Sequence, residues 1–276
     1  MDARQEFERR AAQVDPAYEI PEASKVPGRE GYGWIPFEGL QNTRDLGGLY
    51  GLDGRRVKNG LLLRSGSLSF GTSADIVRLR DEYHLSVVID FRSDDEVAEK
   101  PDPMEELPGV RYVQRSIINE QMIGITQDEL SRKQAQLRAA QPDTSSQSFL
   151  TLFYPHLLTA PSGMSGYRTF FQELLACEHG SVLWHCVVGR DRCGMASALL
   201  EAVLGVPEDE IERDYLATNV YAPAELSATG AASLTSFHAA LDTIEHEYGG
   251  FVGYVEQALG ITPGEMHDLQ ERYLEE

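Results

Sequence analysis

The chain has 276 residues, enough for one large domain, and 42% of them are hydrophobic, enough for a sizeable core. Its 24 Lys and Arg against 44 Asp and Glu leave a net charge of −20. This balance argues against a nucleic-acid partner, because binding a phosphate backbone needs a basic surface. No window reaches the roughly 18 uncharged apolar residues of a spanning helix, so we expect no stable membrane insertion.

The cysteine count and the N-terminus point to a cellular compartment. Three cysteines do not make a disulfide framework. The polar, charged start of the chain, 1–10, is unlike a signal peptide. We therefore expect a cytoplasmic protein, and export without a recognisable signal stays an open alternative.

Residues 1–30 are polar and contain three prolines, so they are expected to form a flexible arm ahead of a domain covering 31–276. In that domain, apolar segments alternate with segments of helical periodicity. This pattern predicts an α/β fold with a mainly parallel central sheet and helices on both faces. The expected strands lie at 60–64, 86–91, 110–117 and 181–185, and the expected helices at 72–83, 167–177, 193–204, 207–218 and within 234–276.

A helical insertion, 119–162, separates the strand at 110–117 from the next core helix. A capping-box pattern precedes a polar helix over 127–140, and an apolar helix is expected over 149–159. An insertion of this length is either a functional lid or a crossover that covers one face of the sheet. Tyr154 in this insertion is expected to pack rather than to form part of a site.

The segment after the last strand combines groups suited to binding an oxyanion. Seven residues, 186–192, lead from the strand directly into a helix. Backbone N–H groups of a tight loop and of a helix start can point at one anion, and the helix end carries roughly half a positive charge. The planar guanidinium of Arg192, the last loop residue, can donate hydrogen bonds to two oxygens at once. The candidate phosphate-binding residues are Val187, Val188, Gly189, Arg190, Asp191 and Arg192.

Cys186 lies in the same electric field. A helix N-terminus and a guanidinium both favour the thiolate, which is the reactive nucleophile. A buried structural cysteine is the simpler interpretation, but the neighbouring Gly189 and Arg192 favour the nucleophile. A zinc site built from His185, Cys186 and Cys193 is disfavoured, because the paired cysteine spacing of structural zinc sites is missing. We expect no metal and no other cofactor, and we expect His185 to orient the loop through a backbone hydrogen bond.

This Cys-x5-Arg loop between a strand and a helix resembles that of the cysteine-dependent protein tyrosine phosphatase superfamily. The longer run at 185–192, His-Cys-Val-Val-Gly-Arg-Asp-Arg, is similar to that of its bacterial tyrosine/serine and lipid phosphatases, His-Cys-x-x-Gly-Lys-Asp-Arg-Thr-Gly. Further runs resemble this branch in the same order, so that the resemblance covers about residues 36–276. They are Asn-Thr-Arg-Asp-Leu-Gly-Gly at 42–48, Arg-Ser-Gly-Ser-Leu at 64–68, Asp-Phe-Arg-Ser at 90–93 followed by Glu96 and by Pro-Asp-Pro at 101–103, and Asp-Tyr-Leu-Ala-Thr-Asn at 214–219.

The resemblance implies a protein tyrosine phosphatase-like fold and metal-independent hydrolysis of phosphate monoesters through a cysteinyl phosphate on Cys186. It implies broad specificity, so the expected partners are proteins carrying phosphotyrosine or phosphoserine/threonine, phosphoinositides and inositol phosphates. The leaving oxygen needs a proton, usually from a carboxylic acid. Asp191 is the first candidate, as the resemblance implies for this branch. Asp90 is the second, because the carboxyl end of its strand should face the same crevice; its simpler role is to pair with Arg92 or Arg192.

Two residues depart from the pattern of the branch. Arg190 replaces the loop lysine. This exchanges a compact ammonium for a planar guanidinium with several donors, which can favour binding of a second phosphate. Cys193 replaces a hydroxyl residue that, in the superfamily, assists breakdown of the phosphocysteine. A thiol is a weaker donor, so slower turnover is expected. The alternative function is therefore a catalytically weak phosphate- or phosphoprotein-binding module, while sulfur transfer is disfavoured by the run 185–192. A reversible disulfide between Cys186 and either Cys193 or Cys177 is a further hypothesis.

The other motif residues have structural interpretations. Arg44 and Asp45 either pair structurally near the site or help to bind substrate, and the structural role is favoured. Arg64 and Arg92 are expected to be internal ion-pair partners rather than ligands.

Overall fold

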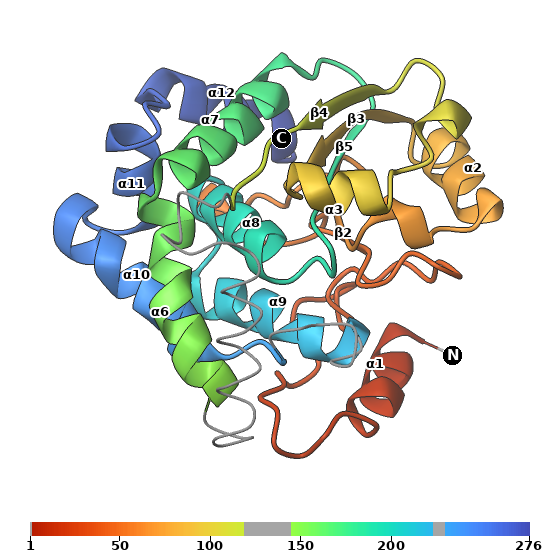
Figure 1. Ribbon diagram of the computed structural model, residues 1–276, viewed down its shortest axis with the longest axis horizontal. Helices are drawn as coiled ribbons and strands as arrows, with labels where there is room; N and C mark the ends of the chain where they lie inside the picture. Colours follow the sequence, from red (N-terminus) through yellow and green to blue (C-terminus); the bar gives the residue numbers. More distant parts are fainter. Residues whose placement is uncertain (1, 119–144, 223–229) are drawn as a thin grey trace.

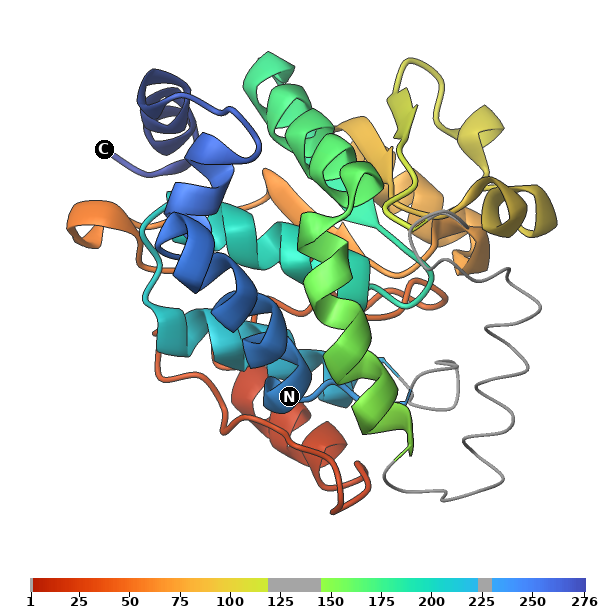
Figure 2. The same cartoon turned by 60° about the vertical axis from the view of Figure 1, so that its left-hand side comes forward.

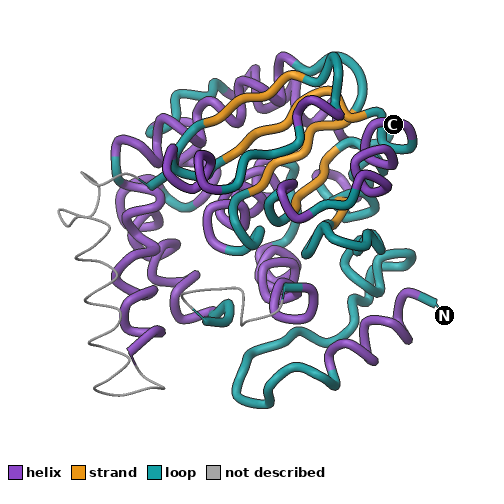
Figure 3. Tube along the Cα trace, turned by 45° about the vertical axis from the view of Figure 1, so that its right-hand side comes forward, coloured by secondary structure: helices purple, strands orange, loops and turns teal. Residues whose placement is uncertain are grey.

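The computed structural model describes residues 2–118, 145–222 and 230–276. A five-stranded sheet with the strand order β1-β2-β5-β3-β4 forms its centre (Figure 3). β1 runs antiparallel to β2, and the other three pairings are parallel, as expected for a mainly parallel sheet. The strands are β1 (Arg44–Asp45), β2 (Leu62–Ser65), β3 (Leu85–Asp90), β4 (Arg111–Gln114) and β5 (Ser181–His185).

Helices cover both faces of the sheet, so the predicted fold class is confirmed (Figure 1). No helix within the described ranges is both long enough and apolar enough to cross a membrane. The described α-helices are α1 (Ala3–Ala11), α2 (Ser73–Asp81), α3 (Asp94–Glu99), α6 (Ser145–Thr159), α7 (Pro161–Ala176), α8 (Asp191–Val203), α9 (Glu208–Tyr221), α10 (Leu234–Tyr248), α11 (Phe251–Gln257) and α12 (Pro263–Tyr273).

The central strand β5 shows how the sheet separates two cores. Successive side chains of a strand point to opposite faces. Leu183 belongs to the smaller core on the α2 side, with Ile76 and Leu79. Val182 and Trp184 belong to the larger core, to which α7 and α8 contribute. Because both faces of β5 are buried, its sequence is a continuous apolar run rather than an alternating one.

Residues 2–30 differ from the expected flexible arm. α1 packs against α9 (Figure 1). Phe7 of α1 is buried and contacts the rings of Tyr32 and Tyr221. Arg29 is buried as well, where it donates to two backbone carbonyls near β1 and reaches Asp214 at 3.3 Å. Single side chains anchor this segment instead of a continuous apolar face, so its sequence shows no helical or strand period.

The predicted insertion, 119–162, is described only from residue 145 onward. α6 begins at Ser145, about one turn before the helix predicted over 149–159, and runs alongside α10 (Figures 1 and 2). The polar helix predicted over 127–140 and its capping box lie outside the described residues. A lid function for the insertion stays a prediction.

Candidate active site

The Cys-x5-Arg loop lies at the carboxyl edge of the sheet. β5 ends at His185, Cys186 follows at once, and α8 begins at Asp191. β3 ends beside β5, because Asp90 pairs with His185 in the parallel register. Only 2% of Cys186 is exposed. The strand–loop–helix arrangement predicted from the sequence is therefore present at the position where parallel α/β sheets form their sites.

The surrounding chain holds the loop by its carbonyl groups. The carbonyl of Val187 accepts a hydrogen bond from the N–H of Ser67 at 2.9 Å. The carbonyls of Val188 and Gly189 accept from Nδ2 of Asn42 at 3.2 and 3.0 Å. Among the described residues, the N–H groups of these three loop residues have no acceptor, so they can serve one anion together. The sequence motif containing Asn42 thus supports the loop rather than the substrate.

Gly189 is required by the shape of the loop. Its φ of +71° is a left-handed conformation that other residues rarely adopt. A Cβ atom at this position would lie 2.6 Å from the carbonyl oxygen of Ser65. The loop can pack this closely against the end of β2 only because residue 189 has no side chain.

Arg192 is oriented by a carboxylate that the sequence interpretation left without a role. Its Nη1 and Nη2 donate to Oε2 and Oε1 of Glu96 at 2.6 and 2.9 Å. Oε2 of Glu96 also accepts from the N–H of Ser93 in the capping box of α3. Burial would raise the pKa of Glu96, but the Arg192 guanidinium and the capping bonds outweigh it and lower that pKa. The capping-box pattern Ser93–Glu96 is the physical signal in the sequence that this side chain is fixed.

Asp90 is engaged in an internal ion pair. Nε of Arg92 donates to both Asp90 oxygens at 3.0 Å, and Nη2 donates to Oδ2 at 2.7 Å. The Tyr112 hydroxyl donates to the same Oδ2 at 2.7 Å. Burial would raise the pKa of Asp90, but His185 and Arg92 outweigh it and lower that pKa. This geometry matches the simpler interpretation of Asp90 and confirms Arg92 as an ion-pair partner.

His185 connects this ion pair to the loop. Its Nδ1 lies 3.1 Å from the carbonyl oxygen of Cys186, consistent with the expected backbone hydrogen bond, and its Nε2 lies 3.0 Å from Asp102. Burial would lower the pKa of His185, but Asp90 and Asp102 outweigh it and raise that pKa. Asp90, Asp102 and His185 are residue types that bind metals. The Arg92 guanidinium contacts both carboxylates, however, so the cluster already contains one cation that offsets part of their charge.

Asp191 is held from two sides at the start of α8. Nε and Nη2 of Arg190 donate to its Oδ1 and Oδ2, both at 2.9 Å. The Tyr154 hydroxyl of α6 donates to Oδ1 at 2.5 Å. Burial would raise the pKa of Asp191, but Arg190 and Tyr154 outweigh it and lower that pKa. The expectation that Tyr154 only packs needs correction: the side chain is buried, yet its hydroxyl contacts a candidate site residue. Nothing local in the sequence signals a contact between helices so far apart in the chain.

A buried ionic cluster supports the loop from behind. Asp214 accepts from Arg44 at 2.9 Å and from Arg64 at 2.8 Å. The other fork nitrogen of Arg64 donates to the carbonyl of Gly189 at 2.9 Å. The structural roles expected for Arg44 and Arg64 are confirmed. The partner of Arg44 is Asp214, whereas Asp45 accepts hydrogen bonds from the N–H groups of two glycines.

The three cysteines occupy different environments. Cys193 is fully buried in the first turn of α8, and its thiol donates to the carbonyl of Trp184 at 3.6 Å. Burial raises the pKa of Cys193 to about 12. Cys177 precedes β5, whereas Cys186 follows it. The intervening strand spans roughly 17 Å at about 3.3 Å per residue, so a Cys177–Cys186 disulfide would need a backbone rearrangement.

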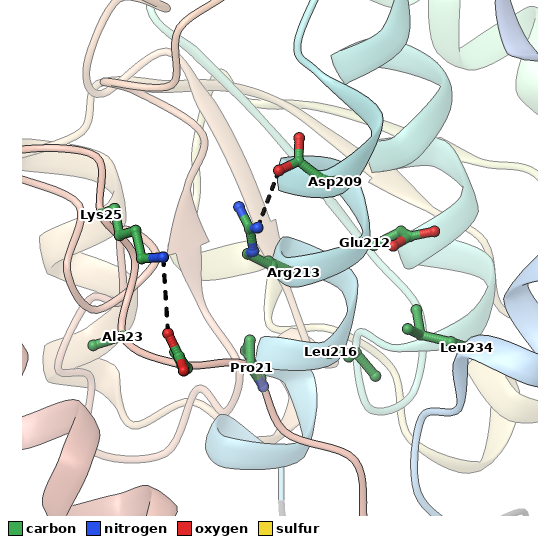
Figure 4. A pocket seen from close by; sticks show the side chains of 9 residues that line it. Pro21, Ala23, Lys25, Asp209, Glu212, Arg213, Leu216 and Leu234 are labelled. Carbon is green, nitrogen blue, oxygen red and sulfur yellow. Dashed lines mark ion pairs between the residues drawn. The ribbon is translucent and has the colours of Figure 1, made fainter.

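A pocket of about 210 Å³ opens beside the loop, and both Val187 of the loop and Arg92 after β3 line it. Its other walls come from the turn after β2, including Phe70, and from α3 and the adjoining Lys100. A larger pocket of about 290 Å³ lies between the N-terminal segment and the outer side of α9, with no loop residue in its lining. In that pocket Lys25 pairs with Glu22 and Arg213 with Asp209 (Figure 4). The candidate active site is the smaller pocket, because Val187 of the loop and Glu96, the partner of Arg192, line it.

The parallel α/β fold and the Cys-x5-Arg loop at its carboxyl edge are the features expected of a phosphatase of this class. Comparison with known proteins identifies the family: residues 35–275 match the model described as "Tyrosine phosphatase family". The chain is 35% identical over 205 residues to a Cupriavidus necator protein bearing a tyrosine-protein phosphatase name, covering 73% of this chain and 67% of that one. It is 23% identical over 233 residues to the tyrosine-protein phosphatase of Nostoc commune, covering 74% of each. The protein belongs to the tyrosine phosphatase family.

Two solved structures also show some similarity to this chain. Kinase associated phosphatase is 10% identical, with a TM-score of 0.41, covering 77% of this chain and 96% of that chain. Pseudomonas aeruginosa TpbA, solved in complex with phosphotyrosine, is 14% identical, with a TM-score of 0.35, covering 68% of this chain and 89% of that chain.

Proposed function

We propose that the protein hydrolyses phosphate monoesters, phosphotyrosine foremost, through a cysteinyl phosphate on Cys186. One observation carries this proposal. A single seven-residue loop holds a cysteine, at least three N–H groups without acceptors among the described residues, and an arginine fork fixed by Glu96. Nucleophile and anion cradle are therefore adjacent, which is what phosphoryl transfer to sulfur requires.

In the first step, the Cys186 thiolate attacks phosphorus while the bond from phosphorus to the leaving oxygen breaks. The N–H groups of the loop, from Val187 to Arg192, and the Arg192 fork hold the remaining phosphate oxygens. A carboxylic acid protonates the leaving oxygen. In the second step, water attacks phosphorus and breaks the bond to sulfur, and the same carboxylate takes the proton of the water.

We assign the acid role to Asp191. Asp191 lies in the loop and its side chain is 17% exposed, whereas the side chain of Asp90 is fully buried against Arg92. Asp90 therefore remains the second candidate, better suited to holding Arg92. The lowered pKa of Asp191 keeps its carboxylate charged while the loop is empty. A bound phosphate dianion would oppose this charge and favour protonation, so the acid forms in the substrate complex.

The substrate class follows from the family and from the loop. Phosphotyrosine is the primary proposal, with phosphoserine/threonine and inositol phosphates or phosphoinositides as further substrates. Arg190 is buried and donates through two nitrogens to Asp191, so its geometry gives little support to a second phosphate site. The mechanism needs a free thiol, which suits a reducing compartment, and we propose a cytoplasmic location.

The test is phosphate release from p-nitrophenyl phosphate in EDTA, between pH 4.5 and 8, for the wild type, Cys186→Ser and Cys177→Ser. The last variant is the matched control, since Cys177 is a buried cysteine outside the loop. We expect wild type and control to turn over and Cys186→Ser to lose at least about 1,000-fold. Rapid acid quench should trap phosphate on the wild type and on the control, but not on Cys186→Ser. Activity in Cys186→Ser would overturn the proposal. Phosphate binding without release by the folded wild type would favour the binding module.

A further inference from the structure

Two tyrosines form a chain of hydroxyl groups that ends on Asp191. Tyr154 comes from α6 and Tyr215 from α9, and both side chains are buried. Their hydroxyl oxygens lie 2.5 Å apart, and the Tyr154 hydroxyl lies 2.5 Å from Oδ1 of Asp191. The rings meet edge to face, with their centroids 6.3 Å apart. This chain links α6, in the predicted insertion, with the start of α8.

The charge of Asp191 fixes which hydroxyl donates each hydrogen bond in this chain. An ionised carboxylate only accepts hydrogen bonds, so the single hydroxyl proton of Tyr154 points at Asp191. Tyr215 must then donate to Tyr154. Burial and the Asp191 charge raise the pKa of both tyrosines, so both keep their protons while Asp191 titrates. The tyrosines are therefore donors and not bases.

The two oxygens of Asp191 have unequal surroundings. Oδ1 accepts from Tyr154 and from Nε of Arg190, whereas Oδ2 accepts from Nη2 of Arg190 alone among the described residues. A proton added to Asp191 therefore binds at Oδ2, where a lone pair remains for it. We propose that Tyr154 is a positioning residue that directs the acid proton of Asp191 to Oδ2. This inference rests on the proposed role of Asp191 as the general acid.

The reaction step balances with this assignment. The Oδ2–H bond of Asp191 breaks as the leaving oxygen gains the proton, and its bond to phosphorus breaks at the same time. Asp191 becomes a carboxylate again, and the two donors at Oδ1 stabilise the charge. Tyr154 keeps its own proton throughout. Without its hydroxyl, the proton of Asp191 would be shared between both oxygens, and fewer molecules would present it to the leaving group.

The experiment compares Tyr154→Phe with Tyr254→Phe. The control also removes a buried hydroxyl that contacts α6, since Tyr254 donates to the carbonyl of Leu158 at 2.5 Å. Phenyl phosphate needs a proton on its leaving group, whereas 2,4-dinitrophenyl phosphate does not. For Tyr154→Phe we expect kcat/KM to fall about 10-fold with phenyl phosphate and less than about twofold with the dinitrophenyl ester. The control should change neither.

The pH profile gives an independent readout. The Tyr154 hydrogen bond lowers the pKa of Asp191, so Tyr154→Phe should keep the acid protonated to higher pH and move the basic limb of kcat upward. A merely structural role would leave this limb in place. If Tyr154→Phe does not fold, Tyr215→Phe should give a smaller change in the same direction.

Asp191→Asn tests the acid role of Asp191 separately from the positioning role of Tyr154. Selective loss on phenyl phosphate in Asp191→Asn, without selectivity in Tyr154→Phe, would overturn the role of Tyr154 and leave the general acid intact. Equal losses on both esters in Asp191→Asn would overturn the acid assignment itself, and the role of Tyr154 with it. Neither outcome affects the assignment of Cys186 as the nucleophile, which the Cys186→Ser variant tests independently.

Discussion

The guanidinium of Arg192 and the carboxylate of Glu96 face each other through two hydrogen bonds, at 2.6 and 2.9 Å. Glu96 is at the same time the capping residue that closes the first turn of α3 with Ser93. One carboxylate thus fixes a helix start and orients the guanidinium that we propose binds phosphate. The position of α3 thereby controls the direction of Arg192.

We predict that Glu96→Gln weakens catalysis while the protein stays folded. The amide cannot accept two charge-assisted hydrogen bonds from the fork, so Arg192 would lose its fixed direction. Misplacement of a positioning group by about 1 Å can cost about 100-fold in rate. We expect kcat/KM for p-nitrophenyl phosphate to fall by about 10- to 100-fold, measured at the pH optimum of the wild type.

The matched control for this prediction is Asp95→Asn, an exposed carboxylate on the same helix. It should retain wild-type kinetics. Wild-type activity in Glu96→Gln, with a normal melting temperature, would show that Arg192 is oriented by other contacts.

Gly189→Ala should damage both stability and activity. A left-handed backbone costs about 1–2 kcal/mol for an L-residue, and the added methyl group would also collide with Ser65. Gly54→Ala isolates the first effect, because Gly54 has a φ of +74° and nothing within 4 Å of its Cβ position. Urea unfolding should show a clearly larger loss for Gly189→Ala, and only this variant should lose phosphatase activity. Equal losses would contradict the close packing of the loop.

Cys193→Ser tests the departure from the family pattern. The buried thiol of Cys193 makes a long sulfur hydrogen bond to the Trp184 carbonyl, whereas a hydroxyl is a better donor to the reacting phosphate. If breakdown of the cysteinyl phosphate limits turnover, the wild type should show a burst of phenol. The serine variant should then raise steady-state kcat several-fold without changing the burst rate. Cys193→Ala should be no faster than the wild type, and a serine variant that is also no faster would contradict the prediction.

Glu201 should make the protein less stable as pH rises. Its side chain is buried, its Oε1 has no hydrogen-bond partner among the described residues, and burial raises its pKa well above the usual range. Above the unfolded value of about 4.3, the unfolded chain loses this proton first. The free energy of unfolding therefore falls with pH, by about 1.4 kcal/mol per unit, until the folded group also ionises.

Glu201→Gln removes this titration. Urea unfolding at pH 5 and pH 8 should show the variant gaining stability over the wild type as pH rises. Glu208→Gln, at an exposed position, should follow the wild type at both pH values. A constant difference between Glu201→Gln and the wild type would show that Glu201 does not change its charge state on unfolding.

The sequence alone determined the chemistry of the loop and most of the regular elements. The proposed nucleophile Cys186, the loop N–H groups and Arg192 lie within seven consecutive residues, so a local pattern defines their relative placement. The start of α2 was predictable for the same reason, since Thr72 and Asp75 form its capping box. The buried strands β3 and β5 were visible as short apolar runs between helical patterns.

Only the tertiary structure decided what holds the loop. Glu96 lies 96 positions from Arg192, Asn42 lies 147 from Gly189, and Tyr154 lies 37 from Asp191. The same applies to residues 2–30, whose anchors Phe7 and Arg29 find their partners far along the chain. Such contacts leave no spacing pattern, because they depend on how whole elements pack. A periodic pattern records which face of an element is buried, but not which partner it meets there.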